Sequence, residues 1–385
     1  MKVKNKLYQL LAIFAISIGV LSSCSLQNPE DVEMNSNQKE ENTTVVLEPK
    51  ETSSVKVDKD NSNYVEGDFS LWSNNSHTVS SIEEYVKDIS DPKSDDFIPI
   101  EDRIAVFDMD GTLYGELAPI YIEWWMYAYR VLDDPNFDAD DDMKEVGEKI
   151  REAGETREIP EELEKEHSIE SARAFADMTV DEYRDYVKEF LNNDAVGFKN
   201  LKYKDATYKP MIQLVKFLQD NDFKVYICSG TDRDLCRVIA EESFNIPNEQ
   251  VIGMDVFLEG EDQDGIDGLD YEMEDDEDVV RSDELIIKNV KMNKVSQIAQ
   301  EIGRKPVLCF GNSSGDTSMG KFVSESNPYR AETYMLIADD DQRDYGNPEK
   351  AEEKAEKWED LGWNVVSMKD EFKTIYGDKV EKEEK

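Results

Sequence analysis

The sequence predicts an α/β fold: a Rossmann-like open parallel sheet with an inserted, mostly α-helical cap domain. The first observation is a set of short apolar runs that lack the polar alternation of a half-exposed strand, as is typical of strands buried on both faces of a parallel sheet. The second is that helical stretches, at residues 208–220 and 295–303, precede two of these runs, as in βαβ units. The runs are residues 104–108, 224–228, 306–310 and 334–339.

The third observation is one connection that is far too long for a simple crossover. About 110 residues separate Gly111 from Lys224, whereas about a dozen are enough to link two parallel strands. The pattern of this segment predicts helices. Pro119 suits the first turn of a helix that continues as "IYIEWWMYAYRVL", and "TVDE" at 179–182 has capping-box spacing. We therefore predict a helical domain inserted after the first strand.

The N-terminus has the pattern of an export signal. Lys2, Lys4 and Lys6 precede the apolar stretch 10–21, which is short for a membrane span. The stretch ends in "LSSC", which resembles the bacterial lipobox, whose cysteine is lipidated. The alternative is an ordinary signal peptide with a chance cysteine. We expect an exported lipoprotein, anchored at the cell membrane or outer membrane through Cys24.

These patterns divide the chain into four parts. Residues 1–23 are predicted to be a signal peptide with a lipobox, and residues 24–75 a flexible linker, because they are polar and acidic with little apolar periodicity. The cap is predicted at 115–205. The α/β core takes the remainder, residues 76–114 and 206–385.

Composition excludes several classes of function. The formal net charge is −44, from 88 acidic and 44 basic residues, which disfavours nucleic acid and anionic lipid as partners. Membrane contact is therefore expected through the lipid anchor only. The two histidines are too few for a multi-histidine zinc site, and they make a Ser-His-Asp triad improbable. The predicted chemistry depends on carboxylates, hydroxyls and lysine, and the sequence leaves the oligomeric state open.

Polar residues follow three of the apolar runs, at the point where each predicted strand ends. Asp108 and Asp110 close the first run, "SGTD" (229–232) the second, and "GNSSGD" (311–316) the third. In open α/β sheets, ligands bind at the carboxyl ends of the strands. Carboxylates, a hydroxyl and glycine-flanked amides at one edge predict a site for phosphate and Mg²⁺, which prefers oxygen ligands.

These residues carry a resemblance to a known family. "DMDGT", a strand that ends in "SG", a lysine and "GNSSGD" resemble, in order, the four motifs of the haloacid dehalogenase superfamily. The likeness is to its phosphatases with a helical cap after the first motif, including phosphoserine and phosphorylcholine phosphatase-like members, and it spans about residues 100–340. It implies a Mg²⁺-dependent phosphomonoester hydrolase for a small phosphorylated metabolite at the cell surface.

The resemblance also implies roles for individual residues. Asp108 is expected to attack phosphorus and form an aspartyl-phosphate, and Asp110 to act as general acid and then base. Thr112 is expected to orient Asp110. Ser229 and the Gly230 amide are expected to hold the phosphoryl oxygens.

The third and fourth motifs leave choices open. Lys294 is the preferred catalytic and phosphate-binding lysine, because it starts a predicted helix, and Lys291 and Lys288 are alternatives. Asn312 occupies a place where an aspartate is common, so it is assigned to phosphate rather than directly to the metal. The implied metal ligands are Asp108, the Asp110 carbonyl and Asp316.

Three alternative functions can be compared with the phosphatase prediction. A phosphotransferase of the same fold would pass the phosphoryl group to an alcohol, and a non-catalytic binding lipoprotein would only hold a ligand. A nucleophile beside an acid favours an enzyme over a binding protein. A dehalogenase usually lacks the second aspartate, so Asp110 favours phosphate chemistry.

Two further segments invite interpretation. The acidic stretch 259–278 does not follow the order of a calcium-binding loop, so we predict a solvated loop or hairpin. Trp124 and Trp125 are adjacent in the first predicted cap helix. They either pack in the core, or one of them lines the cleft and holds a cationic leaving group such as choline.

The lipid anchor is directly testable. We expect Cys24→Ser to release the protein from membranes, because the variant lacks the thiol that would carry the lipid. Membrane fractionation and lipid labelling of the parent and variant measure this. Retention of the variant, together with no lipid labelling of the parent, would contradict the assignment.

Overall fold

The computed structural model describes residues 64–116, 120–160 and 162–383. Cys24, the predicted signal peptide and Pro119 lie outside the described residues, as does most of the predicted linker. Within the described part of the chain, no helix is long and apolar enough to cross a membrane.

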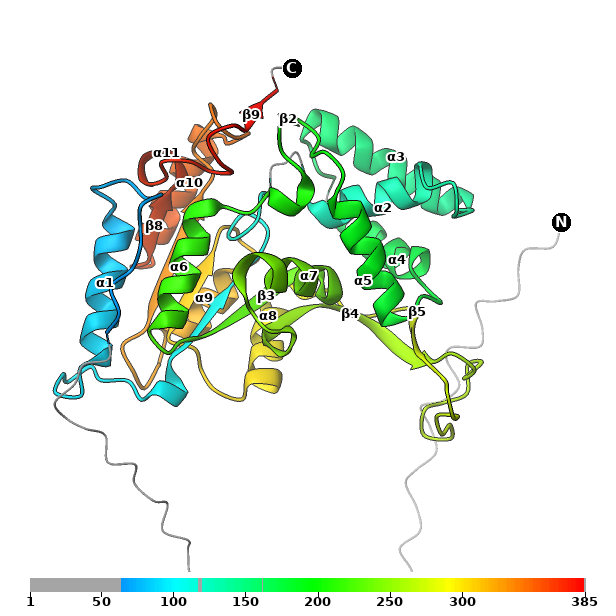
Figure 1. Ribbon diagram of the computed structural model, residues 1–385, viewed down its shortest axis with the longest axis horizontal. Helices are drawn as coiled ribbons and strands as arrows, with labels where there is room; N and C mark the ends of the chain where they lie inside the picture. The colour runs from blue at the N-terminus through cyan, green and yellow to red at the C-terminus, as the bar shows by residue number, and fades with distance from the viewer. Residues whose placement is uncertain (1–63, 117–119, 161, 384–385) are drawn as a thin grey trace, which may run out of the picture. The chain divides into compact units, whose positions relative to one another are not determined.

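The core is a seven-stranded sheet in the order β5-β4-β3-β1-β6-β7-β8, in which all neighbours are parallel except β4 and β5 (Figure 1). This arrangement confirms the predicted fold class. Each of the four predicted apolar runs overlaps a strand. The strands are β1 (Ile104–Phe107), β3 (Lys224–Asp232), β4 (Val251–Gly260), β5 (Val279–Ile287), β6 (Leu308–Gly311), β7 (Glu332–Ile337) and β8 (Asn364–Ser367).

Helices cover both faces of the sheet, as the fully apolar strands require. Successive side chains of a strand point to opposite faces. In β1, Ala105 and Phe107 pack in the large cluster with helices α1, α6 and α7, whereas Val106 packs with α9 on the other face. The core helices are α1 (His77–Ser90), α6 (Lys209–Asp220), α7 (Arg233–Phe244), α8 (Met292–Gln297), α9 (Thr317–Ser324), α10 (Pro348–Glu359) and α11 (Met368–Glu371).

Two predicted helices of the core are present. The first, predicted at 208–220, is α6. The second, predicted at 295–303, begins as α8 and continues as a π-helical turn at Ile298–Ile302. It ends at Gly303, whose φ of +66° is strained for other residues.

Between β1 and residue 205, the described residues form mainly helices, which group together in Figure 1. We call the described residues from 120 to 205 the insertion. The capping box predicted at Thr179 is present, because the Thr179 and Glu182 side chains each accept from the other's backbone N–H. The elements are α2 (Ile122–Leu132), α3 (Asp141–Thr156), α4 (Leu163–Ala174), α5 (Val180–Leu191) and β2 (Phe198–Lys199), which pairs with β9 (Glu381–Lys382). The cap boundaries at 115 and 205 remain a prediction.

The acidic segment 259–278 closes an antiparallel hairpin of β4 and β5, as the composition predicted. Its tip is solvated, and Leu269 there is 93% exposed. This β4–β5 hairpin places Lys288, which directly follows β5, beside the carboxyl ends of the parallel strands.

Candidate active site

A tight turn fixes the two aspartates that follow β1. The Asp108 amide continues the sheet by donating to the Phe310 carbonyl at 2.9 Å. The Met109 carbonyl then accepts from the amides of residues 112, 113 and 114 at 2.8–3.1 Å. Gly111 has a φ of +77°, and a side chain there would collide with Asn312. The turn therefore needs glycine for both conformation and space.

Lys294 lies between two buried carboxylates. Its Nζ is 2.5 Å from Asp108 Oδ1 and 2.7 Å from Asp316 Oδ1. Burial raises the pKa of Asp108 well above its usual value, the charge of Asp316 raises it further, and Lys294 opposes both. Burial disfavours the Lys294 ammonium, but the charges of Asp108 and Asp316 hold its pKa above the usual range. Of the three candidate lysines, Lys294 is the one that contacts these aspartates.

Asp316 also shapes the loop that follows β6. Its Oδ2 accepts from the backbone amides of Asn312 and Ser313, both at 3.1 Å, and from Ser313 Oγ at 3.2 Å. The Asn312 side chain donates from Nδ2 to Glu116 Oε2 at 2.7 Å. Asp316 thus holds Lys294 with one oxygen and the fourth-motif loop with the other.

Asp110 is held by a residue that the sequence analysis did not assign. Thr231 Oγ1 donates to Asp110 Oδ2 at 2.7 Å, whereas Asp110 Oδ1 is buried and has no partner among the described residues. Burial raises the pKa of Asp110, and the Thr231 hydrogen bond opposes that rise. Thr112 Oγ1 is buried and likewise has no partner within the described part of the chain.

The residues of the second motif differ in whether they reach the cavity in front of the aspartates. Ser229 is buried, and its Oγ accepts from the Thr231 amide at 3.1 Å. Gly230 and Thr231, but not Ser229, line the cavity in front of the aspartates. The pairing of β3 with β4 shifts register between Cys228 and Asp232, so simple strand alternation could not have identified Thr231 from the sequence.

A cavity of about 320 Å³ brings most of the predicted residues together. Its inner part is formed by the core, and α2 and α4 of the insertion supply the facing part. The predicted residues that line it are Asp108, Asp110, Gly230, Lys288, Lys291, Lys294, Asn312 and Asp316. The lining residues that the sequence analysis did not assign are Glu116, Tyr121, Glu123, Glu164, Thr231, Val290 and 313–315.

The part of the cavity that the insertion supplies contains acidic and aromatic residues. Burial raises the pKa of Glu116 and of Glu123 to about 7 in each case. Glu123 Oε1 accepts from the Asp232 amide at 3.3 Å, and its Oε2 lies 3.5 Å from Lys288 Nζ. Trp124 is 1% exposed and lines the cavity, whereas Trp125 is not a lining residue and lies against Gly154.

The oxygen atoms of Asp108, Asp110 and Asp316 are the ligands expected for Mg²⁺. Within residues 64–116, 120–160 and 162–383, no group of three or more His, Cys, Asp or Glu side chains is arranged to hold an ion. Two carboxylates and a backbone carbonyl nevertheless fit the oxygen preference of Mg²⁺, which commonly takes few protein ligands plus phosphate and water. The buried Asp108 and Asp316 also repel one another, which a cation would relieve.

Residues 103–323 match the family model of haloacid dehalogenase-like hydrolases. The chain belongs to this family. The matched region includes all four motifs named above, from Asp108 to Asp316. A search of curated proteins gave no match to this hydrolase.

Several solved structures resemble this hydrolase at low identity. A protein of unknown function from Anaerococcus prevotii is 13% identical, covers 80% of this chain and 94% of its own, and has a TM-score of 0.46. A phosphoserine phosphohydrolase-like protein from Francisella tularensis is 14% identical, with 69% and 94% covered and a TM-score of 0.38. Cytosolic 5'-nucleotidase IIIB bound to cytidine is 12% identical, with 76% and 86% covered and a TM-score of 0.45. These similarities are too distant to assign an activity.

The buried Glu123 makes a testable contribution to stability. Its pKa is about 7 in the folded protein against a usual 4.5, so its stabilising contribution is complete below the usual pKa and is lost as the pH rises through 7. Glu123→Gln lacks this titration. Between pH 4 and pH 8, its free energy of unfolding should rise relative to the parent by on the order of 3 kcal/mol. Urea unfolding across this range measures the difference, and parallel pH curves for the two proteins would contradict it.

Proposed function

We propose that this hydrolase is a Mg²⁺-dependent phosphatase that cleaves small phosphomonoesters through an aspartyl-phosphate, exported and anchored by a lipid at Cys24. The observation that supports it most is the pair at the cavity floor. Asp108 is held by Lys294 at 2.5 Å, and Asp110 by Thr231 at 2.7 Å. We infer that Asp108 is the nucleophile and that Asp110, whose Oδ1 has no partner among the described residues, transfers the proton.

In the first step, an Asp108 oxygen attacks phosphorus, and the bond from phosphorus to the leaving oxygen breaks. Asp110 starts protonated and gives its proton to that oxygen, so an alcohol departs. Burial of Asp110 favours the protonated form, and its unpartnered Oδ1 is available to carry the proton. Lys294 and the Gly230 amide balance the charge that develops on the phosphoryl oxygens.

In the second step, water attacks phosphorus of the aspartyl-phosphate and loses a proton to Asp110. The bond between phosphorus and the Asp108 oxygen breaks, which releases phosphate and restores both aspartates. Asp108, the Asp110 carbonyl and Asp316 would hold Mg²⁺, which would offset the negative charge of the phosphate and carboxylates.

The alternatives account for fewer of these contacts. A binding protein would have no use for a nucleophile beside a second carboxylate held by Thr231. A phosphotransferase would share the first step, and the acceptor of the second step distinguishes it. A dehalogenase would need neither Asp110 nor a metal.

The substrate class follows from charge and from the aromatic wall. Six carboxylates line the cavity against three lysines. With Asp110 protonated and Mg²⁺ bound, the other five carboxylates balance the cations when Glu116 and Glu123 are ionised. The phosphate dianion then adds two negative charges, so a cationic leaving group is favoured. Trp124 and Tyr121 line the cavity beside Glu164 and Glu123, and an aromatic ring there would attract such a group. We therefore propose an alkylammonium alcohol as the leaving group.

The covalent mechanism is tested with Asp108→Asn and Asp110→Asn. Asp108→Asn should abolish turnover while the fold survives, because asparagine keeps the size of the side chain but lacks the nucleophilic carboxylate. Asp110→Asn should lower kcat/KM for an alkyl phosphate by about 10²- to 10⁴-fold, and by less for p-nitrophenyl phosphate, whose leaving group needs little protonation. The measurement is phosphate release with and without Mg²⁺.

A matched control is Asp344→Asn, a buried carboxylate that accepts from Tyr376 and does not line the cavity. It should retain parental kcat/KM for both esters. Full activity of folded Asp108→Asn, with folding confirmed by circular dichroism, would refute the covalent mechanism.

The leaving-group proposal is tested with two esters of the same shape. Choline phosphate carries a quaternary ammonium where 3,3-dimethylbutyl phosphate carries a neutral carbon. We expect kcat/KM to favour choline phosphate by about 30-fold, in line with a desolvated cation–π contact of about 2 kcal/mol. Trp124→Leu should reduce the preference and Trp125→Leu should keep it. Equal kcat/KM for the two esters in the parent protein would exclude the cation subsite without touching the phosphatase proposal.

A further inference from the structure

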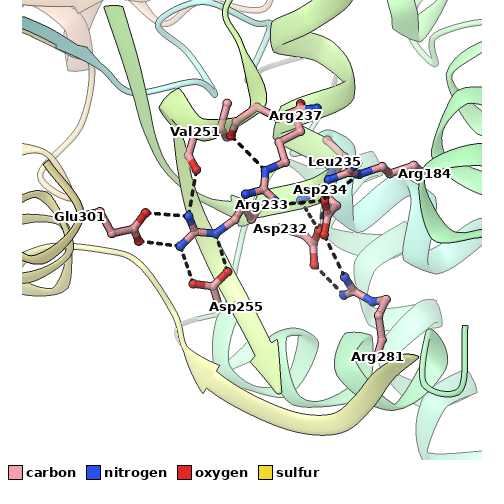
Figure 2. Close-up of polar contacts among 11 residues, drawn as sticks. Arg184, Asp232, Arg233, Asp234, Leu235, Arg237, Val251, Asp255, Arg281 and Glu301 are labelled. Carbon is pink, nitrogen blue, oxygen red and sulfur yellow. Dashed lines mark hydrogen bonds and ion pairs between the residues drawn. The ribbon is translucent and has the colours of Figure 1, made fainter. Parts of the chain in front are cut away.

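A cluster of arginines and aspartates surrounds the carboxyl end of β3 and the start of α7. Figure 2 shows the guanidinium group of Arg281 at Asp232 and that of Arg184 at Asp234, two positions further along the chain. Arg281 comes from the β4–β5 hairpin, and Arg184 comes from α5 of the insertion. The charged members of the cluster are Arg184, Asp232, Arg233, Asp234, Arg237, Asp255, Arg281 and Glu301.

The pair at the centre is the most buried. Arg281 Nη2 is 2.6 Å from Asp232 Oδ2, and the side chains are 3% and 2% exposed. The Arg281 guanidinium also lies over the ring of Tyr183, 3.8 Å from its centroid. A buried ion pair gains little net stability over an apolar pair of the same size, but removing one partner is costly because the other charge stays buried without compensation.

The backbone of Arg281 is bound to the insertion. Its amide donates to the Met178 carbonyl, and its carbonyl accepts from the Asp177 amide, both at 2.9 Å. One residue of the hairpin therefore holds the insertion with its main chain and the core with its side chain.

On the core side, Asp232 is connected to Asp110 through the neighbouring residue Thr231. Asp232 follows Thr231, whose hydroxyl donates to Asp110 Oδ2 at 2.7 Å. The Asp232 amide donates to Glu123 Oε1 at 3.3 Å, and its Oδ1 caps α7 by accepting from the Asp234 and Leu235 amides. Displacing Asp232 would displace Thr231, because the two are adjacent in the strand.

We propose that Arg281 is a positioning residue, which holds Asp232 so that Thr231 keeps Asp110 in place for proton transfer while the insertion stays docked. The role assigned to Asp110 rests on the proposed function. Arg281 does not line the cavity, so its path to Asp110 runs through Asp232 and Thr231. Its Nη1 also lies 3.9 Å from Asp234 Oδ2, which is outside that path. A displacement of about 1 Å at a reacting group can cost about 100-fold in rate, so a small shift of Thr231 is enough to be measured.

The insertion offers a matched control. Arg184 also joins the insertion to the core, with Nε and Nη2 at 2.8 and 2.6 Å from Asp234 Oδ1. Asp234 lies in α7, beyond the strand that carries Thr231. Arg184→Lys and Arg281→Lys are thus the same chemical change on the same surface, but only Arg281→Lys acts on Asp232.

The experiment compares kcat/KM for an alkyl phosphate with that for p-nitrophenyl phosphate. This constant covers the steps through formation of the aspartyl-phosphate, so it reports Asp110 as an acid. We expect the alkyl-to-aryl ratio to fall about tenfold in Arg281→Lys, in the same direction as in Asp110→Asn, and to keep the parental value in Arg184→Lys. A residue that only stabilised the fold would lower both constants together.

A second measurement does not depend on turnover. Hydrogen exchange of the amides at 229–232 and at 177–179 should be faster in Arg281→Lys, and in Arg184→Lys those at 229–232 should keep the parental rate. Should Arg281→Lys fail to fold, Asp232→Asn replaces it, because asparagine keeps the size and the helix cap but loses the charge.

These measurements distinguish failure of the Arg281 proposal from failure of the proposed function. A parental ratio in the folded variant, where Asp110→Asn does lower it, would show that Arg281 has no positioning role. If the parent releases no phosphate from either ester, the proposed function fails. Exchange at 229–232 then decides alone whether Arg281 holds this strand: faster exchange supports the link, and unchanged exchange overturns it.

Discussion

The ammonium of Lys294 between Asp108 and Asp316 is the interaction on which the candidate site depends. Two buried carboxylates this close repel one another, and burial raises the pKa of Asp108 well above its usual value. A single cation within 2.7 Å of both makes the arrangement tolerable. It also joins the ends of β1 and β6 to α8, so three core elements meet at one group. The position of Asp108 is therefore a property of the whole sheet edge.

The insertion and the β4–β5 hairpin line the parts of the cavity that the core leaves open. The core supplies the aspartates, Lys294 and the amides of two loops. Glu123 and Trp124 come from α2, and Lys288 comes from the end of the hairpin. Because the insertion lies between β1 and α6 in the chain, its side chains reach the cavity from outside the sheet. The cavity wall that faces the aspartates is thus built from a different part of the chain than the aspartates themselves.

Much of this was predictable from sequence, for identifiable reasons. Buried parallel strands have a strong apolar signature, and the motif residues follow them directly, so Asp108 and Asp316 were found together. Lys294 could only be preferred among three lysines, because the helix face that turns it inward is fixed by packing. Glu123 has the pattern of an ordinary acidic residue in a first helical turn, and nothing local indicates that it is 1% exposed. The two tryptophans could not be told apart, since Gly154, which receives Trp125, is 29 residues away in sequence.

The strand order has a consequence for how this chain folds. β1 pairs with β3 and β6, which begin at Lys224 and Leu308, so neither neighbour of the central strand is local in sequence. Helices α2 to α5, by contrast, are contiguous along the chain. Long-range pairing is slow because the loop must close before any contact forms. Asp108 and Asp110 therefore stay hydrated until the last third of the chain arrives, and their burial is a late event in folding.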